Sequence, residues 1–401
     1  MTTTSSTSSV TVSAGRSRPF FWEEAADDWR AACEAGRRPA FSEYVTRSLR
    51  ALREGVGREA GTVPALRPVH RVSLRDDGLD RLPARYVAEH CTLTLFGLHQ
   101  HTASKPVHRP GVGLGTACLL LRRGETLTDA AAERRLIAAA TAQDLHELVQ
   151  HLQRLVPLLR MAGVGLDYTR LFRELAVWDG PGRNRVLRAW GLQYTDPGSP
   201  GPAGVEGEGN GEAESRERAP YWVTFEPGSP DAGAQLAALR AGTGREPGTV
   251  AVMWPFHRTR MVSEWRDKGS LTRDLAAEHI ALTLFARHQQ THDRRMHVTG
   301  NSPGTAAGLL ARKAATDSEG KAATAALERR FGHLLTSADA DELAMHLRSF
   351  APLLNRAGVG LDYDLLRIAL RTWDDPRRPH AAGRFRQRWD RDFHATVTAS
   401  S

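Results

Sequence analysis

The chain has 401 residues, and its 54 lysines and arginines exceed its 46 aspartates and glutamates to give a net charge of +8 at neutral pH. Hydrophobic residues make up 41% of the sequence, which is enough for a folded core and excludes a wholly disordered chain. No apolar run approaches the ~20 residues of a membrane-spanning helix, and Met1 to Ser17 lacks the apolar segment of an export signal, so a cytoplasmic protein without a membrane partner is expected. The basic residues are mainly arginines, which bind phosphate groups in bidentate fashion and therefore favour a polyanionic partner.

Two segments at the N-terminus precede any repeated sequence. Residues 1–19 are rich in Ser and Thr and are expected to form a disordered tail. Residues 20–38 carry aromatic and acidic side chains that have no apparent counterpart later in the chain. An extra helix and a docking segment are both open interpretations of this stretch.

The rest of the chain contains the same long block twice. The sequence EHCTLTLF at 89–96 recurs as EHIALTLF at 278–285, and AGVGLDY at 162–168 recurs unchanged at 357–363. A unit of this length exceeds the periods of about 20 to 50 residues typical of solenoid repeats, and it is long enough to bury its own core. The sequence therefore predicts two similar modules in tandem.

Apolar residues recur every three to four positions through both repeats, and no alternating strand pattern of convincing length occurs. The predicted helices lie, in chain order, over 85–100, 115–121, 144–161 and 171–178 in the first repeat and over 273–290, 304–311, 341–357 and 365–373 in the second. Pro157 and Pro352 predict a kink or a junction inside the third helix of each set. Asp144, Asp167 and Asp362 are predicted N-caps.

Between the repeats, residues 195–219 contain much Gly, Pro, Glu and Ser, with six acidic and two basic residues, and they predict a flexible linker. The predicted fold class is all-α, with two helical-bundle modules in tandem joined by this linker. The predicted boundaries are a disordered tail over 1–19, a first helical module over 20–194, the linker over 195–219, a second helical module over 220–396 and a tail over 397–401.

Signatures of catalysis are missing from the sequence. Cys33, Cys91 and Cys118 form no CxxC pair and have no counterpart in the second repeat, which argues against a disulfide framework or a repeated zinc site. No nucleophile elbow, phosphate-binding loop, HExxH motif or paired aspartate cluster occurs. We therefore expect no enzymatic activity, no cofactor and no metal.

The repeated histidines are the one pattern that invites a metal or acid–base interpretation. Glu89 and His90 precede His99 on one predicted helix, and the same three residue types recur in the second repeat. His90 and His99 are nine positions apart, a helical rotation of about 900°, which places them on opposite sides of the helix. A structural or RNA-contacting role is the better interpretation.

Basic residues recur at matching places in both repeats and flank predicted helix ends. Arg122-Arg123 is matched with Arg312-Lys313, and Arg134-Arg135 with Arg329-Arg330. Solvated helix faces or local salt bridges would explain any single one of them. Together they favour a surface that follows a phosphate backbone. Four tryptophans, Trp178, Trp190, Trp373 and Trp389, are expected in the core rather than stacked on bases. The candidate nucleic-acid-binding residues are Arg53, Lys105, Arg109, Arg122, Arg123, Arg134, Arg135, Arg240, Arg294, Arg295, Arg312, Lys313, Arg329 and Arg330.

The order of motifs in each repeat resembles a known family. A Leu-Arg-Xaa-Gly-Xaa-Gly-Arg turn is followed by a helix ending in His-Gln, a Gly-Thr-Ala segment, a Glu-Arg-Arg helix, a Gly-Xaa-Gly-Leu-Asp-Tyr motif and a Trp-bearing last helix. This succession is similar to the small subunit of the type I-E CRISPR surveillance complex Cascade, the CasB family. The resemblance covers about residues 40–194 and again 225–396.

The resemblance implies an all-helical subunit without enzymatic activity that is present as a pair in the complex. Its implied partners are the backbone and large subunits, the crRNA, and the target and displaced DNA strands. It implies that basic residues brace the crRNA and target strand and hold the displaced strand without reading sequence, which tips the nearly balanced exchange of duplexes in R-loop formation. By position, the resemblance implies that the paired basic residues make these contacts. They are Arg122, Arg123, Arg134 and Arg135 in the first copy and Arg312, Lys313, Arg329 and Arg330 in the second. Arg53 and Arg240 are weaker candidates.

The fusion of two copies departs from the family pattern, and it implies that one polypeptide occupies both small-subunit positions. The loops 101–110 and 290–300 are dissimilar, which indicates different neighbours for the two copies. A free-standing tandem helical nucleic-acid-binding regulator is the alternative, and it predicts sequence-dependent duplex binding. A nuclease would need metal-dependent turnover that replacement of His99 or His288 abolishes.

Overall fold

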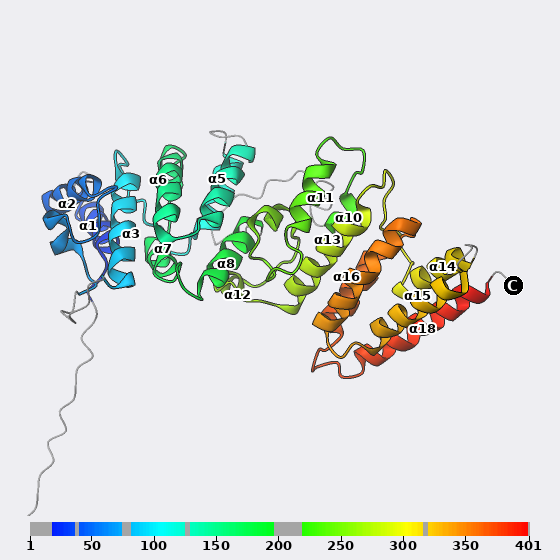
Figure 1. Cartoon of the computed structure of the whole chain (residues 1–401). Coiled ribbons are helices and arrows are strands. Elements are labelled where there is room, and N and C mark those ends of the chain that lie inside the picture. The colour runs from blue at the N-terminus through cyan, green and yellow to red at the C-terminus, as the bar shows by residue number, and fades with distance from the viewer. Residues whose placement is uncertain are drawn as a thin grey trace, which may run out of the picture. The chain divides into compact units, whose positions relative to one another are not determined.

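All named elements of the protein are helices (Figure 1). The computed structural model describes residues 18–36, 40–73, 82–124, 129–195, 219–315 and 320–399. Within these segments the extended pairings are two isolated bridges, which join His108 to Leu166 and His297 to Leu361. The all-α prediction is confirmed. Most of the predicted linker and of the predicted N-terminal tail lies outside the described residues.

The chain divides into two compact units. The first unit consists of residues 1–111 and 152–176, and the second consists of residues 112–151 and 177–401. The second unit therefore combines part of the first repeat with all of the second repeat. The predicted module boundaries follow the sequence repeats instead, and they stay a prediction.

The first unit is built on α3 (Ala84–Gln100), whose buried residues include Leu93 and Phe96. The helix α6 (Leu145–Met161) belongs to it only from Leu152 onward. Its other elements are α1 (Phe21–Glu34), α2 (Glu43–Glu54), η1 (Pro64–Val69), α3 (Ala84–Gln100) and α7 (Tyr168–Leu175).

The second unit contains a large core in which Phe285, Phe331, Phe350 and Trp389 are buried. Three of its helices come from the first repeat, α4 (Leu114–Arg123), α5 (Asp129–Thr141) and α8 (Arg183–Thr195). The others are α10 (Tyr221–Thr224), α11 (Ala232–Arg240), η2 (Ala251–Phe256), α12 (Ser263–Asp267), α13 (Arg273–Gln289), α14 (Pro303–Ala315), α15 (Gly320–Thr336), α16 (Ala340–Ala357), α17 (Tyr363–Thr372) and α18 (Ala381–Thr398). Within the described segments, every helix is too short or too polar to cross a membrane.

Local sequence signals explain several helix ends. The side chain of Asp167 accepts a hydrogen bond from the backbone of Arg170, and Asp362 accepts from two backbone N–H groups at the start of α17. Asp144 accepts from the backbone N–H of Glu147 at 2.8 Å, so all three predicted N-caps are confirmed. Pro157 and Pro352 lie inside α6 and α16, each of which continues as one helix.

The segment 20–38 contains a helix, α1, and its start has a counterpart in the second repeat. Trp22 donates from Nε1 to Oγ1 of Thr169 at 2.8 Å, and Trp222 donates from Nε1 to Oδ1 of Asp364 at 3.0 Å. Both indoles are 1% exposed or less. The expectation of no counterpart was wrong, because the second copy keeps only a pair of aromatic residues on a single helical turn, beginning at Tyr221.

All four tryptophans that were expected in the core are buried. Trp178 and Trp190 stack with ring centroids 5.2 Å apart, and Trp373 and Trp389 lie 5.4 Å apart. Their exposed fractions are 3% or less. They are unavailable for stacking on bases, as predicted.

Candidate nucleic-acid interface

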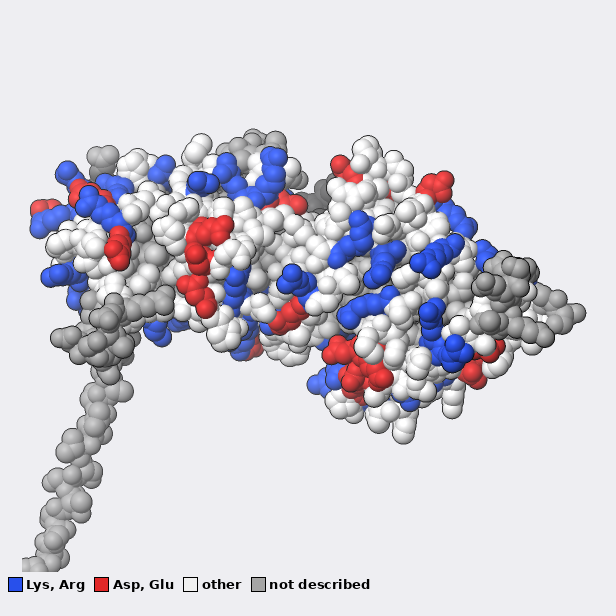
Figure 2. All heavy atoms as spheres, in the orientation of Figure 1, with Lys and Arg blue, Asp and Glu red and all other residues white. Residues whose placement is uncertain are grey.

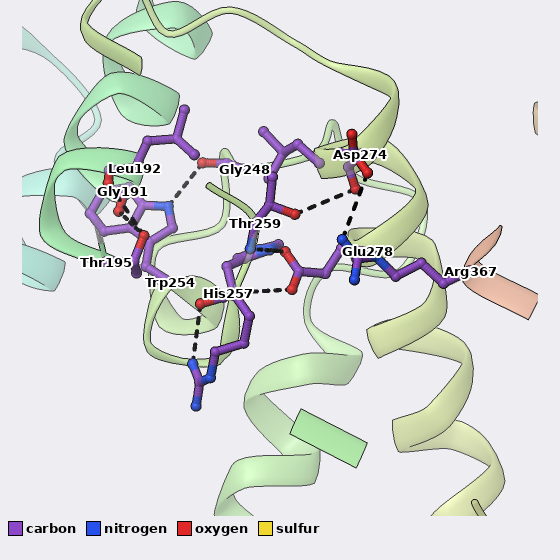
Figure 3. A network of polar contacts seen from close by, with 12 residues as sticks. Gly191, Leu192, Thr195, Gly248, Trp254, His257, Thr259, Asp274, Glu278 and Arg367 are labelled. Atoms are coloured by element: carbon purple, nitrogen blue, oxygen red, sulfur yellow. Dashed lines mark hydrogen bonds and ion pairs between the residues drawn. The ribbon is translucent and has the colours of Figure 1, made fainter. Parts of the chain in front are cut away.

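A buried glutamate holds the chain that follows the 3-10 helix in each repeat, and Figure 3 shows the glutamate of the second repeat. Glu278 accepts from the backbone N–H of Arg258 at 2.7 Å and of Thr259 at 3.0 Å, and it contacts Nδ1 of His257 at 3.2 Å. Burial alone would raise the pKa of Glu278, but the hydrogen bonds and the charge of His257 lower it to about 2. Glu89 makes the same three kinds of contact in the first repeat. These carboxylates are fully used in holding the fold.

The histidines of the His-Gln pairs lie against the tyrosines of the Leu-Asp-Tyr motifs. Nδ1 of His99 is 2.9 Å from the hydroxyl of Tyr168, and Nδ1 of His288 is 2.9 Å from the hydroxyl of Tyr363. Burial lowers the pKa of both histidines to about 4. They are neutral, buried core groups.

The other repeated histidine contacts backbone carbonyls. Nε2 of His90 lies 3.0 Å from the carbonyl oxygen of Arg58, and Nε2 of His279 lies 3.0 Å from that of Gly242. Both imidazoles are 3% exposed. A structural role holds for all four histidines, because none of them reaches a surface where RNA could bind.

Among the described residues, one group of three side chains has the spacing of a metal site, with ligand atoms of His297, Asp362 and Asp364 within 4.8 Å of one another. Each member has a protein partner. His297 accepts from the backbone N–H of Tyr363, Asp362 caps α17, and Asp364 accepts from the indole of Trp222. These contacts account for the cluster, because His297 and Asp362 bind backbone N–H groups at the start of α17 and Asp364 holds the indole of Trp222.

The two dissimilar loops have the same hydrogen-bond framework. Oε1 of Gln100 accepts from the backbone N–H of Val107 at 3.0 Å, and Oε1 of Gln289 accepts from that of Met296 at 2.8 Å. Each glutamine also donates to two carbonyls of its own loop. The loops therefore differ in their exposed side chains and not in their backbone path.

Basic residues of the second copy meet at the C-terminal end of α16. Nζ of Lys313 donates to the carbonyl of Ala357 at 2.5 Å, and Arg294 donates to the carbonyl of Gly358 at 2.5 Å. The C-terminus of α16 attracts cations to this point, and both side chains are nevertheless exposed. Arg295 instead donates to the carbonyl of Val223 in α10 at 3.0 Å and is also exposed. Figure 2 shows several Lys and Arg side chains over the region of α16.

The arginine pairs of α5 and α15 are exposed to solvent. Arg134 and Arg135 follow Glu133, and Arg329 and Arg330 take the same places in the second repeat. None of these four arginines forms an ion pair with a carboxylate within the described part of the chain. They are free to contact phosphate groups.

The pairs at the ends of α4 and α14 are matched differently from the expectation. A Cβ on Gly115 would meet the carbonyl of Trp190, and a Cβ on Gly304 would meet that of Trp389, so these glycines occupy equivalent positions. This register aligns Arg123 with Arg312. In the same register Arg122 corresponds to Ala311. Arg122 is half-buried, and its guanidinium carbon lies 5.1 Å from the centre of the Tyr194 ring. The predicted match of Arg122 with Arg312 is one residue out of register.

The remaining candidates differ in accessibility. Lys105 and Arg109 are exposed in the first unit, and the aliphatic part of Arg109 lies against Gly165. Arg53 and Arg240 are half-buried at the ends of α2 and α11.

Sequence reasoning missed a row of arginines on the last helix. Arg384, Arg388 and Arg391 of α18 are exposed and lie four and three positions apart, which places them on one face of the helix. Arg377 and Arg378 precede the helix and are also exposed. The helical spacing in the sequence was the signal that would have revealed them.

The first repeat meets the second through α8, within the second unit (Figure 3). The indole of Trp254 lies over Gly191, and its Nε1 donates to the carbonyl of Gly248 at 2.9 Å. Arg188 forms an ion pair with Glu246. We name these contacts between α8 and residues 246–269 the inner contact.

A family model described as CRISPR-associated protein Cse2 matches residues 48–194 and again 235–394, which together make up well over half of the chain. The chain is also similar to the crystal structure of CasB from Thermobifida fusca, with 28% sequence identity and a TM-score of 0.33 over 46% of this chain and 97% of that chain. The comparison with curated proteins gave no match. Since the family model matches twice, the chain belongs to the Cse2 (CasB) family of Cascade small subunits and carries two copies in tandem.

Proposed function

We propose that the chain is the non-catalytic small subunit of a type I-E surveillance complex and that one fused chain fills the two positions of a small-subunit pair. Family membership places it with other Cascade subunits. The second family segment and the inner contact support the pairing of both copies in one chain. The repeated glutamates and histidines support a role without catalysis, because the fold uses their polar atoms internally.

The proposed activity is sequence-independent binding of nucleic-acid backbone, which braces the crRNA and the target DNA and holds the displaced strand. The observation that carries this proposal is the recurrence of Arg134 and Arg135 as Arg329 and Arg330. The pair is exposed on α5 in the first copy and on the corresponding helix, α15, in the second. Neither pair has an ion-pair partner among the described residues. An exposed arginine pair without an internal partner gains most by neutralising phosphates.

The energetic reasoning follows from the balance of strand exchange. The heteroduplex that forms is about as stable as the DNA duplex that it replaces, so modest backbone contacts decide how far the exchange proceeds. Two or more arginine contacts to phosphate release counterions and thereby favour the R-loop, in which the displaced strand is bound. The bases face away from such contacts, so the guide alone sets the target.

The test is R-loop formation by the complete complex reconstituted with chain variants. Replacing Arg134, Arg135, Arg329 and Arg330 by Ala is expected to reduce R-loop yield at physiological salt and to weaken the salt dependence of binding. Arg47→Ala is the matched control, because Arg47 is exposed on α2 and paired with Glu43. Unchanged yield and salt dependence in the fourfold variant would remove these residues from the proposal.

A further inference from the structure

We propose that the exposed indole of Trp265 on α12 is a stacking platform for one unpaired base of single-stranded DNA. The proposal rests on the proposed function, because the displaced strand of an R-loop is the strand left without a pairing partner. It adds a contact to a base face to the backbone contacts made by arginines. Stacking accepts every base, so the guide still sets the target.

Trp265 differs from the other eight tryptophans of the chain. Its side chain is 53% exposed, whereas seven of the nine tryptophans are buried and Trp29 is half-buried. Trp254, which anchors the inner contact against Gly191, is only 2% exposed. Tryptophan is highly buried on average, so the informative case is the one that the fold leaves in solvent.

The local fold turns this indole outward. Neighbouring residues of a helix point about 100° apart, and Arg266, the next residue on α12, is buried. The backbone N–H of Ser270 donates to the carbonyl of Trp265 at 2.9 Å and closes the end of the short helix. Val262, three positions before Trp265 and therefore on the same face, is 62% exposed. The outward face of α12 is thus apolar.

The helix that carries the platform is held in place by α8 (Figure 1). Nε2 of Gln193 donates to Oδ1 of Asp267 at 3.3 Å, and Nε of Arg188 donates to the carbonyl of Gly269 at 2.9 Å. The platform therefore lies where the two copies meet. A ring on a fixed backbone loses little conformational freedom when a base stacks on it, which favours binding.

Two exposed arginines flank the platform. Arg260 lies just before the apolar face of α12 in the sequence. Arg185 lies on α8, where its carbonyl oxygen would be 2.0 Å from a Cβ on Gly269. Neither arginine forms an ion pair with a carboxylate in the segments that the structure describes. Both can therefore bind phosphate groups next to a stacked base.

The other charges of α12 are balanced. Lys268 pairs with Glu264 at 2.6 Å, and Arg266 pairs with Asp267 at 3.2 Å. The two flanking arginines thus leave the surroundings of the indole with an excess of positive charge. An aromatic face between basic groups is the combination with which proteins bind single strands. This charge complementarity favours a DNA strand over a protein as the ligand.

The platform belongs to the second copy alone. The corresponding stretch of the first repeat, from His70 to Tyr86, contains no aromatic residue between these two. The arginine pairs recur in both copies, whereas the exposed indole occurs once in the chain. We therefore expect one stacked base for each chain.

The experiment compares two oligonucleotides of equal length by fluorescence anisotropy with the full chain at fixed salt. One is a thymidine strand, and the other has abasic sites at its central positions, so both carry the same phosphates. The wild type is expected to bind the thymidine strand about fivefold or more tightly than the abasic strand. Trp265→Ala should bind both strands as weakly as the wild type binds the abasic strand.

Two variants serve as controls. Trp265→Phe keeps an aromatic face and should retain most of the preference for the thymidine strand. Tyr44→Ala removes another exposed ring, which is 45% exposed on α2, and should leave both affinities unchanged. The salt dependence of binding should be the same in Trp265→Ala and in the wild type, because no phosphate contact is lost.

The outcomes separate this proposal from the proposed function. Equal binding of both strands by the wild type, or a preference that persists in Trp265→Ala, would overturn the stacking site and leave backbone binding intact. Failure to bind either strand would contradict both. Unchanged DNA binding together with reduced incorporation of Trp265→Ala into the assembled complex would assign the indole to a protein neighbour and overturn the proposal.

Discussion

The helices α8 and α18 end the two copies at equivalent places, yet their surfaces differ. Every residue of α8 from Val186 to Tyr194 is buried, because the helix lies between elements of its own copy and the start of the second copy. On α18 only Ala381, Trp389 and Phe393 are buried, and arginines occupy much of the rest. The two helices share the face that carries the buried tryptophan, and they differ in the opposite face, which is covered in α8 and exposed in α18.

The largest effect is expected from the anchor of the inner contact. Trp254→Ala should lower the free energy of unfolding by about 3–5 kcal/mol, since it removes a buried aromatic side chain and leaves a cavity. Chemical denaturation measures this change. Trp265→Ala is the control, because Trp265 is 53% exposed, and its effect should stay within about 0.5 kcal/mol. Equal effects of the two substitutions would contradict the assigned anchor.

The two copies share buried histidines and should therefore respond alike to acid. Burial lowers the pKa of His99, His279 and His288 to about 4 in the folded protein, against about 6.5 in an unfolded chain. The unfolded state takes up protons first as the pH falls, so the stability contribution is complete above pH 6.5 and is lost down to about pH 4. Each histidine can account for up to ~3 kcal/mol.

The corresponding measurement is the free energy of unfolding at intervals between pH 7 and pH 4.5. His288→Gln removes one of the titrating groups. The free energy of unfolding of this variant should therefore fall less between pH 7 and pH 4.5 than that of the wild type. A variant profile as steep as that of the wild type would show that His288 does not titrate with a lowered pKa.

Placing alanine at the equivalent positions of α8 and α18, Gly191 and Asp390, sharpens the comparison of the two helices. Gly191→Ala should cost about 1–3 kcal/mol because its Cβ overlaps the indole of Trp254, whereas Asp390→Ala should change stability by less than about 0.5 kcal/mol. Thermal unfolding of both variants provides the measurement. A similar loss in both would mean that α18 is also covered in the free chain.

The smallest expected effect concerns the exposed face of α18. Replacing Arg384, Arg388 and Arg391 by Ala should leave the melting temperature unchanged. It should reduce the slope of log affinity against log salt for single-stranded DNA by about 0.7 for each phosphate that the variant no longer neutralises. Fluorescence anisotropy at several salt concentrations measures the slope. An unchanged slope would show that these arginines are solvated and neutralise no phosphate groups of the DNA.

Helices with long apolar periodicity were predictable from the sequence, because their signals are local. The caps at Asp167 and Asp362 and the buried Trp190 followed from the residues themselves. The aromatic start of the second copy was missed because it consists of one helical turn at Tyr221, too short for a periodic pattern.

The inner contact was not predictable from periodicity, because it joins residues more than 50 positions apart and depends on a missing side chain at Gly191. The register of α4 against α14 was misjudged for a similar reason. Two basic residues in a row look alike in the sequence, whereas the packing of Gly115 and Gly304 fixes which of them are equivalent.

The central claim is that one chain supplies both small-subunit positions, and native mass spectrometry of the assembled complex tests it most directly. The chain is co-expressed with the other type I-E subunits and a crRNA, and the copies in each target-binding complex are counted from the mass. One copy per complex is the predicted result. Two copies in a complex that binds its target would contradict the claim.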